Sequence, residues 1–89
     1  MNQRVRTSEA DVTLNELLSK EITKVRMYQD YYYVDTKKTY FYDETIYEVN
    51  KNNKDLKRTD FLDFALAVDN IHQLPTITPE EFRRRMKEN

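Results

Sequence analysis

The chain has 89 residues with no cysteine and no glycine, 15 Lys and Arg against 16 Asp and Glu, and a formal charge of −1. This length leaves room for one small domain spanning residues 1–89, and the missing cysteines exclude a disulfide framework and a thiolate metal site. The balanced charge disfavours a polybasic nucleic-acid tail and an acidic surface that imitates DNA.

Residues 1–11 carry charges but no apolar core of a secretory signal, and we expect residues 1–7 to be flexible. The longest apolar stretch, Phe61 to Val68, is interrupted by Asp63 and is far shorter than the roughly 20 residues of a membrane span. The absence of cysteine fits a reducing compartment. We therefore expect a cytoplasmic protein that does not enter a membrane.

The first predicted element is a helix that ends near Gln29. Two start signals compete, Ser8-x-x-Asp11 and Thr13-x-x-Glu16, and the second matches the capping box more closely. The apolar side chains of this helix fall within one arc of about 140° when projected at about 100° per residue. They are Leu14, Leu17, Leu18, Ile22, Val25 and Tyr28.

Glu21 lies in the middle of that apolar arc. A carboxylate there is costly unless it is paired or hydrogen-bonded. One interpretation is a rim position, where the methylene groups pack and the carboxylate pairs with a tyrosine hydroxyl or a lysine. The other is an acid that contacts a partner protein.

Between Tyr31 and Val49 the composition changes to residues typical of strands. We predict strands at Tyr31 to Val34 and Thr39 to Tyr42, joined by a turn over residues 35–38. Ile46 to Val49 is either a third strand or a bulged continuation of the second. A polar loop follows over residues 50–55, whose asparagines are the expected left-handed positions in a glycine-free chain.

A second helix is predicted from Thr59 or Asp60 to about Ile71. Its apolar face comprises Phe61, Phe64, Ala65, Val68 and Ile71. Leu62 and Leu66 lie well off that face, so the helix is either enclosed inside the domain or presents a second face to another protein. A short terminal helix is predicted after Thr78-Pro79, with Phe82 and Met86 on its apolar face.

These elements predict an α+β fold in the order α-β-β-(β)-α-α, with the helices packed on one face of a short antiparallel sheet. A domain this small buries a modest core, so association with a partner or a second copy would supplement its stability.

Enzymatic machinery is hard to assemble from this composition, and we expect no enzyme, no cofactor and no metal site. The single histidine, His72, lies three residues after Asp69, and two candidate ligands do not make a site. We interpret His72 as a residue at a helix end. The run Arg83 to Arg85 is interpreted as a solvated helix end, because adjacent helical residues point in different directions.

The tyrosines of the predicted strands are the main candidates for binding. Tyrosine brings a large rigid area with a polar tip and is enriched at protein interfaces. The candidate protein-binding residues are Tyr31, Tyr33, Tyr40, Tyr42, Tyr47, Glu21, Leu62 and Leu66. The same tyrosines, with Lys37 and Lys38, could instead stack single-stranded bases, but Asp35, Asp43, Glu44 and Glu48 would repel phosphates. Alternation along a strand would also send about half of the tyrosines into the core.

We therefore hypothesise a small non-enzymatic protein-protein interaction module that occupies a surface of a larger protein. Its size and its tilt toward Lys, Asn and Tyr, typical of AT-rich coding sequence, suggest a phage or mobile-element regulator or inhibitor of a host protein. The alternative is a single-stranded nucleic-acid-binding protein that uses a tyrosine-rich sheet face. Association with a second copy stays open.

Overall fold

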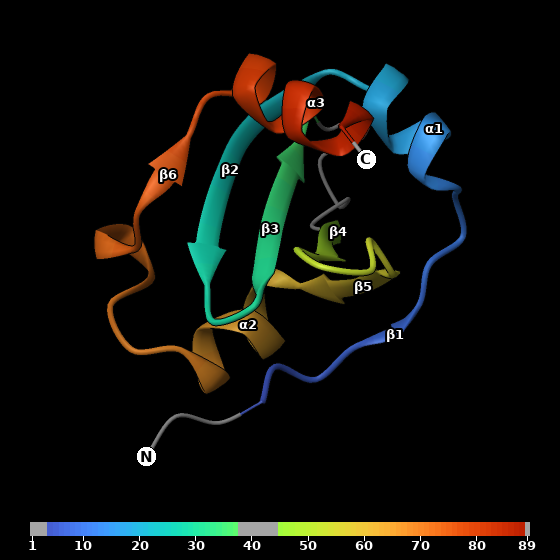
Figure 1. Cartoon of the computed structure of the whole chain (residues 1–89). Helices are drawn as coiled ribbons and strands as arrows, with labels where there is room; N and C mark the ends of the chain where they lie inside the picture. The colour runs from blue at the N-terminus through green and yellow to red at the C-terminus, as the bar shows by residue number, and fades with distance from the viewer. Residues whose placement is uncertain (1–3, 38–44, 89) are drawn as a thin grey trace.

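The fold is organised by a six-stranded antiparallel sheet in the order β1-β5-β4-β3-β2-β6, seen in a computed structural model that describes residues 4–37 and 45–88 (Figure 1). The strands are β1 (Ser8–Glu9), β2 (Ile22–Tyr28), β3 (Tyr31–Thr36), β4 (Thr45–Asn50), β5 (Leu56–Asp60) and β6 (Thr76–Ile77). The helices are α1 (Leu14–Ser19), α2 (Phe61–Ala67) and α3 (Pro79–Lys87), with a short 3-10 helix η1 (Ile71–Gln73).

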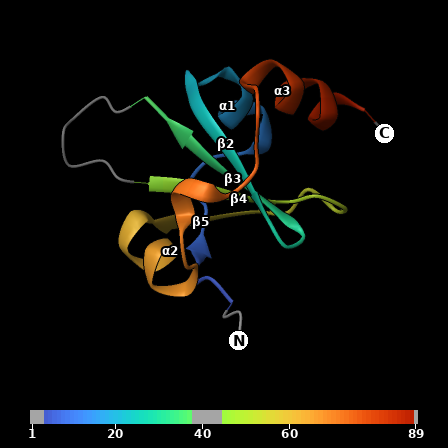
Figure 2. The ribbon, with the colours of Figure 1, turned by 90° about the vertical axis from the view of Figure 1, so that its left-hand side faces the viewer.

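The predicted α+β class is confirmed, but the helices do not share one face of the sheet. α1 and α3 lie together on one side and α2 lies on the other, as Figures 1 and 2 show. The reason is strand alternation: neighbouring residues such as Tyr32 and Tyr33 point to opposite faces, and both are buried. A sheet that is apolar on both faces needs cover on both faces.

The core is accordingly divided in two. The α1/α3 face buries Leu17, Ile22, Val25, Tyr32, Val34, Tyr47, Val49, Phe82 and Met86. The α2 face buries Val5, Tyr33, Ile46, Phe64, Val68 and Ile71.

The prediction of one long helix ending near Gln29 is wrong beyond Ser19. The Thr13 capping box forms as predicted, but the chain then enters β2 at Ile22. A register shift between Ile22 and Lys24 inserts an extra residue. Ile22 and Val25 therefore reach the same core although they are three positions apart, a spacing that imitates a helical period.

The hairpin from β2 to β3 turns through two residues, Gln29 and Asp30, between the paired Tyr28 and Tyr31. Gln29 adopts a φ of 53°, the positive value that so short a hairpin requires and that glycine would normally supply. In the polar loop over residues 50–55 it is Lys54, not an asparagine, that takes a positive φ of 63°. The predicted strand at Thr39 to Tyr42 lies outside the described residues.

The remaining predicted elements need smaller corrections. α2 begins after the Asp60 cap as predicted but ends at Ala67, because Val68 is extended and Asn70 is left-handed, with a φ of 57°. α3 follows the Thr78 cap with Pro79 in its first turn. β5 has no counterpart in the predicted elements, since three of its five residues are charged and its strand form is stabilised by pairing with β4.

Residues 4–9, which we call the strap, run beside β5 and end in the two-residue strand β1. Val5 is 2% exposed in the core of the α2 face, and Arg4 pairs with Glu48 on β4. Flexibility of residues 1–7 stays a prediction, but Arg4 and Val5 are tied to the sheet by these contacts. Residues 1–3 lie outside the described residues.

Candidate protein-binding surface

The predicted tyrosine surface is largely core. Tyr33 is fully buried and Tyr47 is buried, so neither side chain offers area to a partner of the folded chain. Tyr31 is half-buried at the edge of the α2-face core. Tyr40 and Tyr42 lie outside the described residues. The tyrosines of β3 and β4 therefore stabilise the domain through packing, which alternation along the strands allows.

Tyr33 is held in a buried polar network at the centre of the α2 face. Its hydroxyl donates to Glu48 Oε2 at 2.8 Å, and its ring stacks on Phe64 with centroids 4.5 Å apart. Burial, together with the hydrogen bond to Glu48, raises the pKa of the Tyr33 hydroxyl. The neutral phenol is therefore the form that the folded chain favours.

Glu48 carries the charge of this network, and its side chain is only 2% exposed. Arg4 donates to both carboxylate oxygens, at 2.7 and 2.8 Å, a paired geometry typical of strong charge-assisted bonds. The guanidinium of Arg4 also lies 4.3 Å from the centre of the Tyr31 ring. The hydrogen bond to Glu48 raises the pKa of Arg4, so the guanidinium stays charged.

A second ion pair lies further along the same face. Arg26 is 5% exposed and donates to Asp35 Oδ2 at 3.0 Å. Arg26 and Tyr33 are opposite each other in the ladder between β2 and β3, and Tyr33 is opposite Glu48 in the next ladder. The sheet thus places both ion pairs on the α2 face, where each joins one almost fully buried charge, Glu48 or Arg26, to a more exposed partner.

Glu21, the predicted partner-contacting acid, does not lie on an apolar helix face. It precedes β2, and its side chain is 68% exposed with Lys37 Nζ at 3.7 Å. The apolar face that made it unusual disappears because residues 22–28 are a strand. An exposed pair of this kind contributes little to stability.

The outer side of α2 carries the most exposed large hydrophobic side chains among the described residues. Leu62 is 65% exposed, Leu66 is 72% exposed, and Phe61 is 38% exposed. Projected at about 100° per residue, Leu62 and Leu66 point away from Phe64, which is fully buried. The prediction of a second apolar side on this helix is confirmed, and that side faces solvent.

Acidic residues accompany these leucines. Asp60 and Asp69 are exposed at either end of the segment, and Asp63 lies in the first turn of α2. Residues 60–69 contain no Lys or Arg. The outer side of α2 is therefore an apolar strip with an acidic border, which we call the α2 surface.

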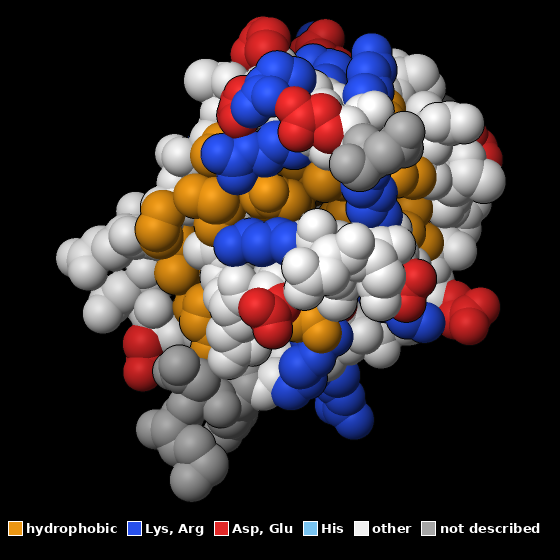
Figure 3. Space-filling model, in the orientation of Figure 1, with side chains coloured by type: hydrophobic (Ala, Val, Ile, Leu, Met, Phe, Trp, Pro, Cys, Tyr) orange, Lys and Arg blue, Asp and Glu red, His pale blue; other side chains and the backbone are white. Residues whose placement is uncertain are grey.

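A second apolar region lies on the face shown in Figure 3, where hydrophobic side chains form a band below α3 and over β2 and β3. Met27, Leu56 and Ile77 are half-buried beside the α1/α3-face core. Lys and Arg side chains lie across the band, and Lys51 Nζ is 5.4 Å from the centre of the Tyr32 ring. This band is thus partly covered by the chain itself, unlike the α2 surface.

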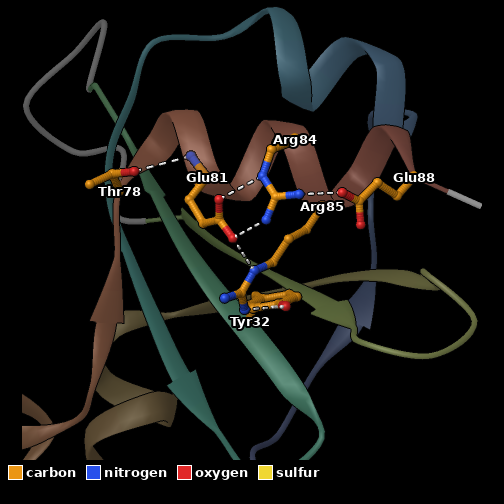
Figure 4. A network of polar contacts seen from close by, with 6 residues as sticks. All are labelled: Tyr32, Thr78, Glu81, Arg84, Arg85 and Glu88. Carbon is orange, nitrogen blue, oxygen red and sulfur yellow. Dashed lines mark hydrogen bonds and ion pairs between the residues drawn. The ribbon is translucent and has the colours of Figure 1, made fainter.

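The arginines of α3 are engaged within the chain (Figure 4). Arg84 and Arg85 both donate to Glu81, and Arg85 also donates to the Tyr32 hydroxyl at 3.1 Å. These hydrogen bonds lower the pKa of Glu81 to about 2. Arg83 donates to the backbone carbonyl groups of Leu18 and Lys20, linking α3 to the end of α1. Arg83, Arg84 and Arg85 therefore form hydrogen bonds within the chain and do not form a flat phosphate-binding patch.

Asp69 and His72 are both exposed, on either side of the left-handed Asn70. Within residues 4–37 and 45–88, no three His, Cys, Asp or Glu side chains gather in a way that could hold a metal ion. Over the same ranges, no helix is long and apolar enough to cross a membrane.

Two features of the structure escaped the sequence analysis. The first is the Arg4-Glu48 pair, whose partners are 44 positions apart. The only available signal was the placement of Glu48 on the same side of its strand as the buried Ile46. The second is the set of hydrogen bonds that the α3 arginines make within the chain.

Comparisons with protein-family models, with curated proteins and with solved structures found no match.

Proposed function

We propose that this chain is a non-enzymatic protein-binding module that acts in the cytoplasm and attaches to a larger protein through the α2 surface. The observation that supports this proposal is the exposure of Leu62 and Leu66, at 65% and 72%, on one side of one helix. Large apolar side chains gathered on a surface are typical of interaction sites. Small phage regulators and inhibitors of host enzymes act in this way, by occupying a surface.

The acidic border of the α2 surface indicates the chemistry of the partner. Asp60, Asp63 and Asp69 lie within the same ten residues as Leu62 and Leu66, and residues 60–69 contain no Lys or Arg. An apolar groove bordered by Lys or Arg would bury the leucines and complement the carboxylates. Two copies of the α2 surface would instead bring six such carboxylates together, so we favour a different protein as the partner at this site.

The alternative function, binding of single-stranded nucleic acid, has less support. Stacking needs accessible aromatic faces. Tyr32, Tyr33 and Tyr47 are buried in the described strands. Binding to oligonucleotides that weakens steeply with added salt would favour this alternative over the proposed function.

The test compares three forms of the full chain as bait for affinity capture from host cells. They are the wild type, Leu62→Ser/Leu66→Ser, and a control with Asn15→Ser/Lys87→Ser at exposed positions of α1 and α3. We expect the wild type and the control to retain one partner protein. The double leucine variant should capture at least tenfold less of it, which corresponds to a loss of about 1.4 kcal/mol in binding free energy.

Calorimetry with the purified partner then checks direct binding. Charge complementarity predicts an affinity that falls as salt rises, and a smaller salt dependence for Asp63→Asn. Equal capture by all three baits, with the leucine variant correctly folded by circular dichroism, contradicts the proposal.

A further inference from the structure

We infer that the part of the sheet that holds the strap, namely the outer edge of β5 with the Glu48 side chain beside it, is a strand-accepting site, and that a second copy of this chain delivers its own residues 4–9 to it, so that two chains associate by exchanging straps. This inference concerns the edge of the sheet at β5 and not the α2 surface, and it does not depend on the proposed function. It rests on how closely the sheet recognises each part of the strap.

Recognition begins at Arg4. Its two terminal guanidinium nitrogens donate to the two oxygens of the Glu48 carboxylate, and the guanidinium lies over the Tyr31 ring at 4.3 Å from the ring centre. With the strap in place the Glu48 side chain is 2% exposed, and without Arg4 its one remaining hydrogen-bond partner among the described residues would be the Tyr33 hydroxyl. A buried carboxylate of that kind strongly favours a cation from outside the sheet.

The domain also contacts the next two residues of the strap. Val5 is 2% exposed and packs in the same core as Ile46 and Phe64. The carbonyl of Arg6 accepts a hydrogen bond from the Thr59 hydroxyl at 2.7 Å. An anchoring cation, an apolar pocket and a backbone contact in sequence are the usual elements of recognition of an extended peptide.

The strap then adds a strand to the sheet. Ser8 pairs with Arg58 and Glu9 pairs with Lys57, both antiparallel, along the outer edge of β5. Removing the strap would leave β5 as an open edge, which readily pairs with another chain. The Glu48 carboxylate, the apolar contacts of Val5 and the open edge of β5 together therefore favour one kind of ligand. It is an extended segment that begins with arginine, continues with an apolar residue and ends in residues able to pair as a strand.

The second copy is the occupant because it carries that segment by identity. The described polar contacts of the strap with the rest of the chain reach positions 31, 48, 57, 58 and 59, and residues 10–13, which join it to α1, belong to no helix or strand. A segment whose contacts are all distant, on a connection without regular structure, can make the same contacts on a neighbouring chain. Symmetric exchange then preserves each contact of the strap and requires a change of backbone direction in residues 10–12, where Val12 packs against the α1/α3-face core, while Thr13 keeps its cap on α1.

The absence of cysteine allows a direct test on the full chain. Ser8→Cys and Arg58→Cys are made in separate chains, which are mixed, unfolded and refolded together, and gently oxidised. Opposite residues of an antiparallel pair are close enough for a disulfide. Exchange predicts a disulfide between the two different chains, with a yield that rises with total protein concentration.

Three controls make the outcome decisive. A chain with both Ser8→Cys and Arg58→Cys shows, by an internal disulfide in dilute solution, that the pair geometry is right. Ser8→Cys mixed with Leu62→Cys measures random collision, since position 62 lies on the outer side of α2. Adding Arg4→Ala to the Ser8→Cys chain should lower the mixed yield roughly tenfold, whereas Arg6→Ala at an exposed site should not.

If the internal disulfide forms and the mixed pair yields no more than the collision control at any concentration, strap exchange is excluded. A mixed yield above that control but insensitive to Arg4→Ala would equally overturn the inference, because disulfide formation would then not depend on the contact between Arg4 and Glu48. Neither result bears on the α2 surface, whose leucines are unchanged in the exchange pair.

Discussion

The two faces of the sheet are stabilised in different ways. The α1/α3 face is filled by aliphatic and aromatic side chains such as Val34, Val49 and Phe82. The α2 face buries the charged Glu48 and Arg26 beside Tyr33, and each needs a partner from another segment, Arg4 from the strap and Asp35 from β3. Hydrophobic packing tolerates approximate placement, whereas a buried carboxylate requires one specific partner. The α2 face is therefore where register and the position of the strap are specified.

The largest effect is expected on the apolar face. Phe82 is fully buried and packs edge-to-face on Tyr32 with ring centroids 5.4 Å apart. Phe82→Ala should lower the free energy of unfolding by about 3 to 5 kcal/mol through lost burial and a residual cavity. Urea denaturation measures this, with Lys87→Ala on the exposed side of α3 as the control. A loss below about 1 kcal/mol would mean that α3 is not packed as described.

On the α2 face, removing one partner of the ion pair should cost nearly as much. Arg4→Ala leaves the Tyr33 hydroxyl as the remaining hydrogen-bond partner of Glu48 among the described residues. The free energy of unfolding should fall by about 3 kcal/mol, the lower end of the range for a broken buried ion pair, because the Arg4 side chain is half exposed and water reaches it. Arg4→Ala/Glu48→Gln should recover part of that loss because the buried charge is gone. Arg6→Ala is the control, and an equal effect of both arginine variants would refute the comparison.

A smaller loss is expected at the tyrosine of the network. Tyr33→Phe keeps the ring on Phe64 and removes the hydroxyl that donates to Glu48, so the free energy of unfolding should fall by about 1.5 to 3 kcal/mol. Tyr31→Phe, at a half-buried ring, serves as the control in the same denaturation experiment. If Tyr33→Phe is as stable as the wild type, the hydrogen bond contributes nothing net.

The pH dependence of stability, compared between the wild type and Tyr33→Phe, tests whether Tyr33 is buried as a neutral phenol. The pKa of Tyr33 is raised in the folded chain, so its contribution to stability is present below the ordinary tyrosine pKa of about 10 and is lost as pH rises above that value. The wild type should therefore lose stability more steeply above about pH 10 than Tyr33→Phe does. Parallel curves from thermal melts across that range would show that Tyr33 is not buried as a neutral phenol.

The smallest effect on stability is expected on the outer side of α2, which belongs to neither core. Leu62→Ser/Leu66→Ser should change the free energy of unfolding by no more than about 0.5 kcal/mol per site. Phe64→Ala, about half a turn away and fully buried, should cost several times more and is the matched comparison in the same urea titration. Strong destabilisation by the leucine variant would show that these side chains are covered in the folded protein.

Features set by nearby residues were determined by the sequence alone. The caps at Thr13 and Thr78 each satisfy a backbone amide three positions ahead, and both form as predicted. The polar loop over residues 50–55 follows β4 as predicted. The off-face position of Leu62 and Leu66 follows from helical geometry over one turn. In each case the energy that decides the conformation is local, so the pattern predicts it.

Features set by distant residues were decided only by the tertiary structure. Ile22 to Tyr28 has a spacing that suits a helix, yet pairing with β3 and a register shift make it a strand. Tyr33 and Tyr47 became core because helices cover both faces of the sheet. Glu48 is compensated by Arg4, 44 positions away, a contact that exists only once four strands are aligned. Long-range pairing and burial outweigh local preference, and neither can be read from the order of residues.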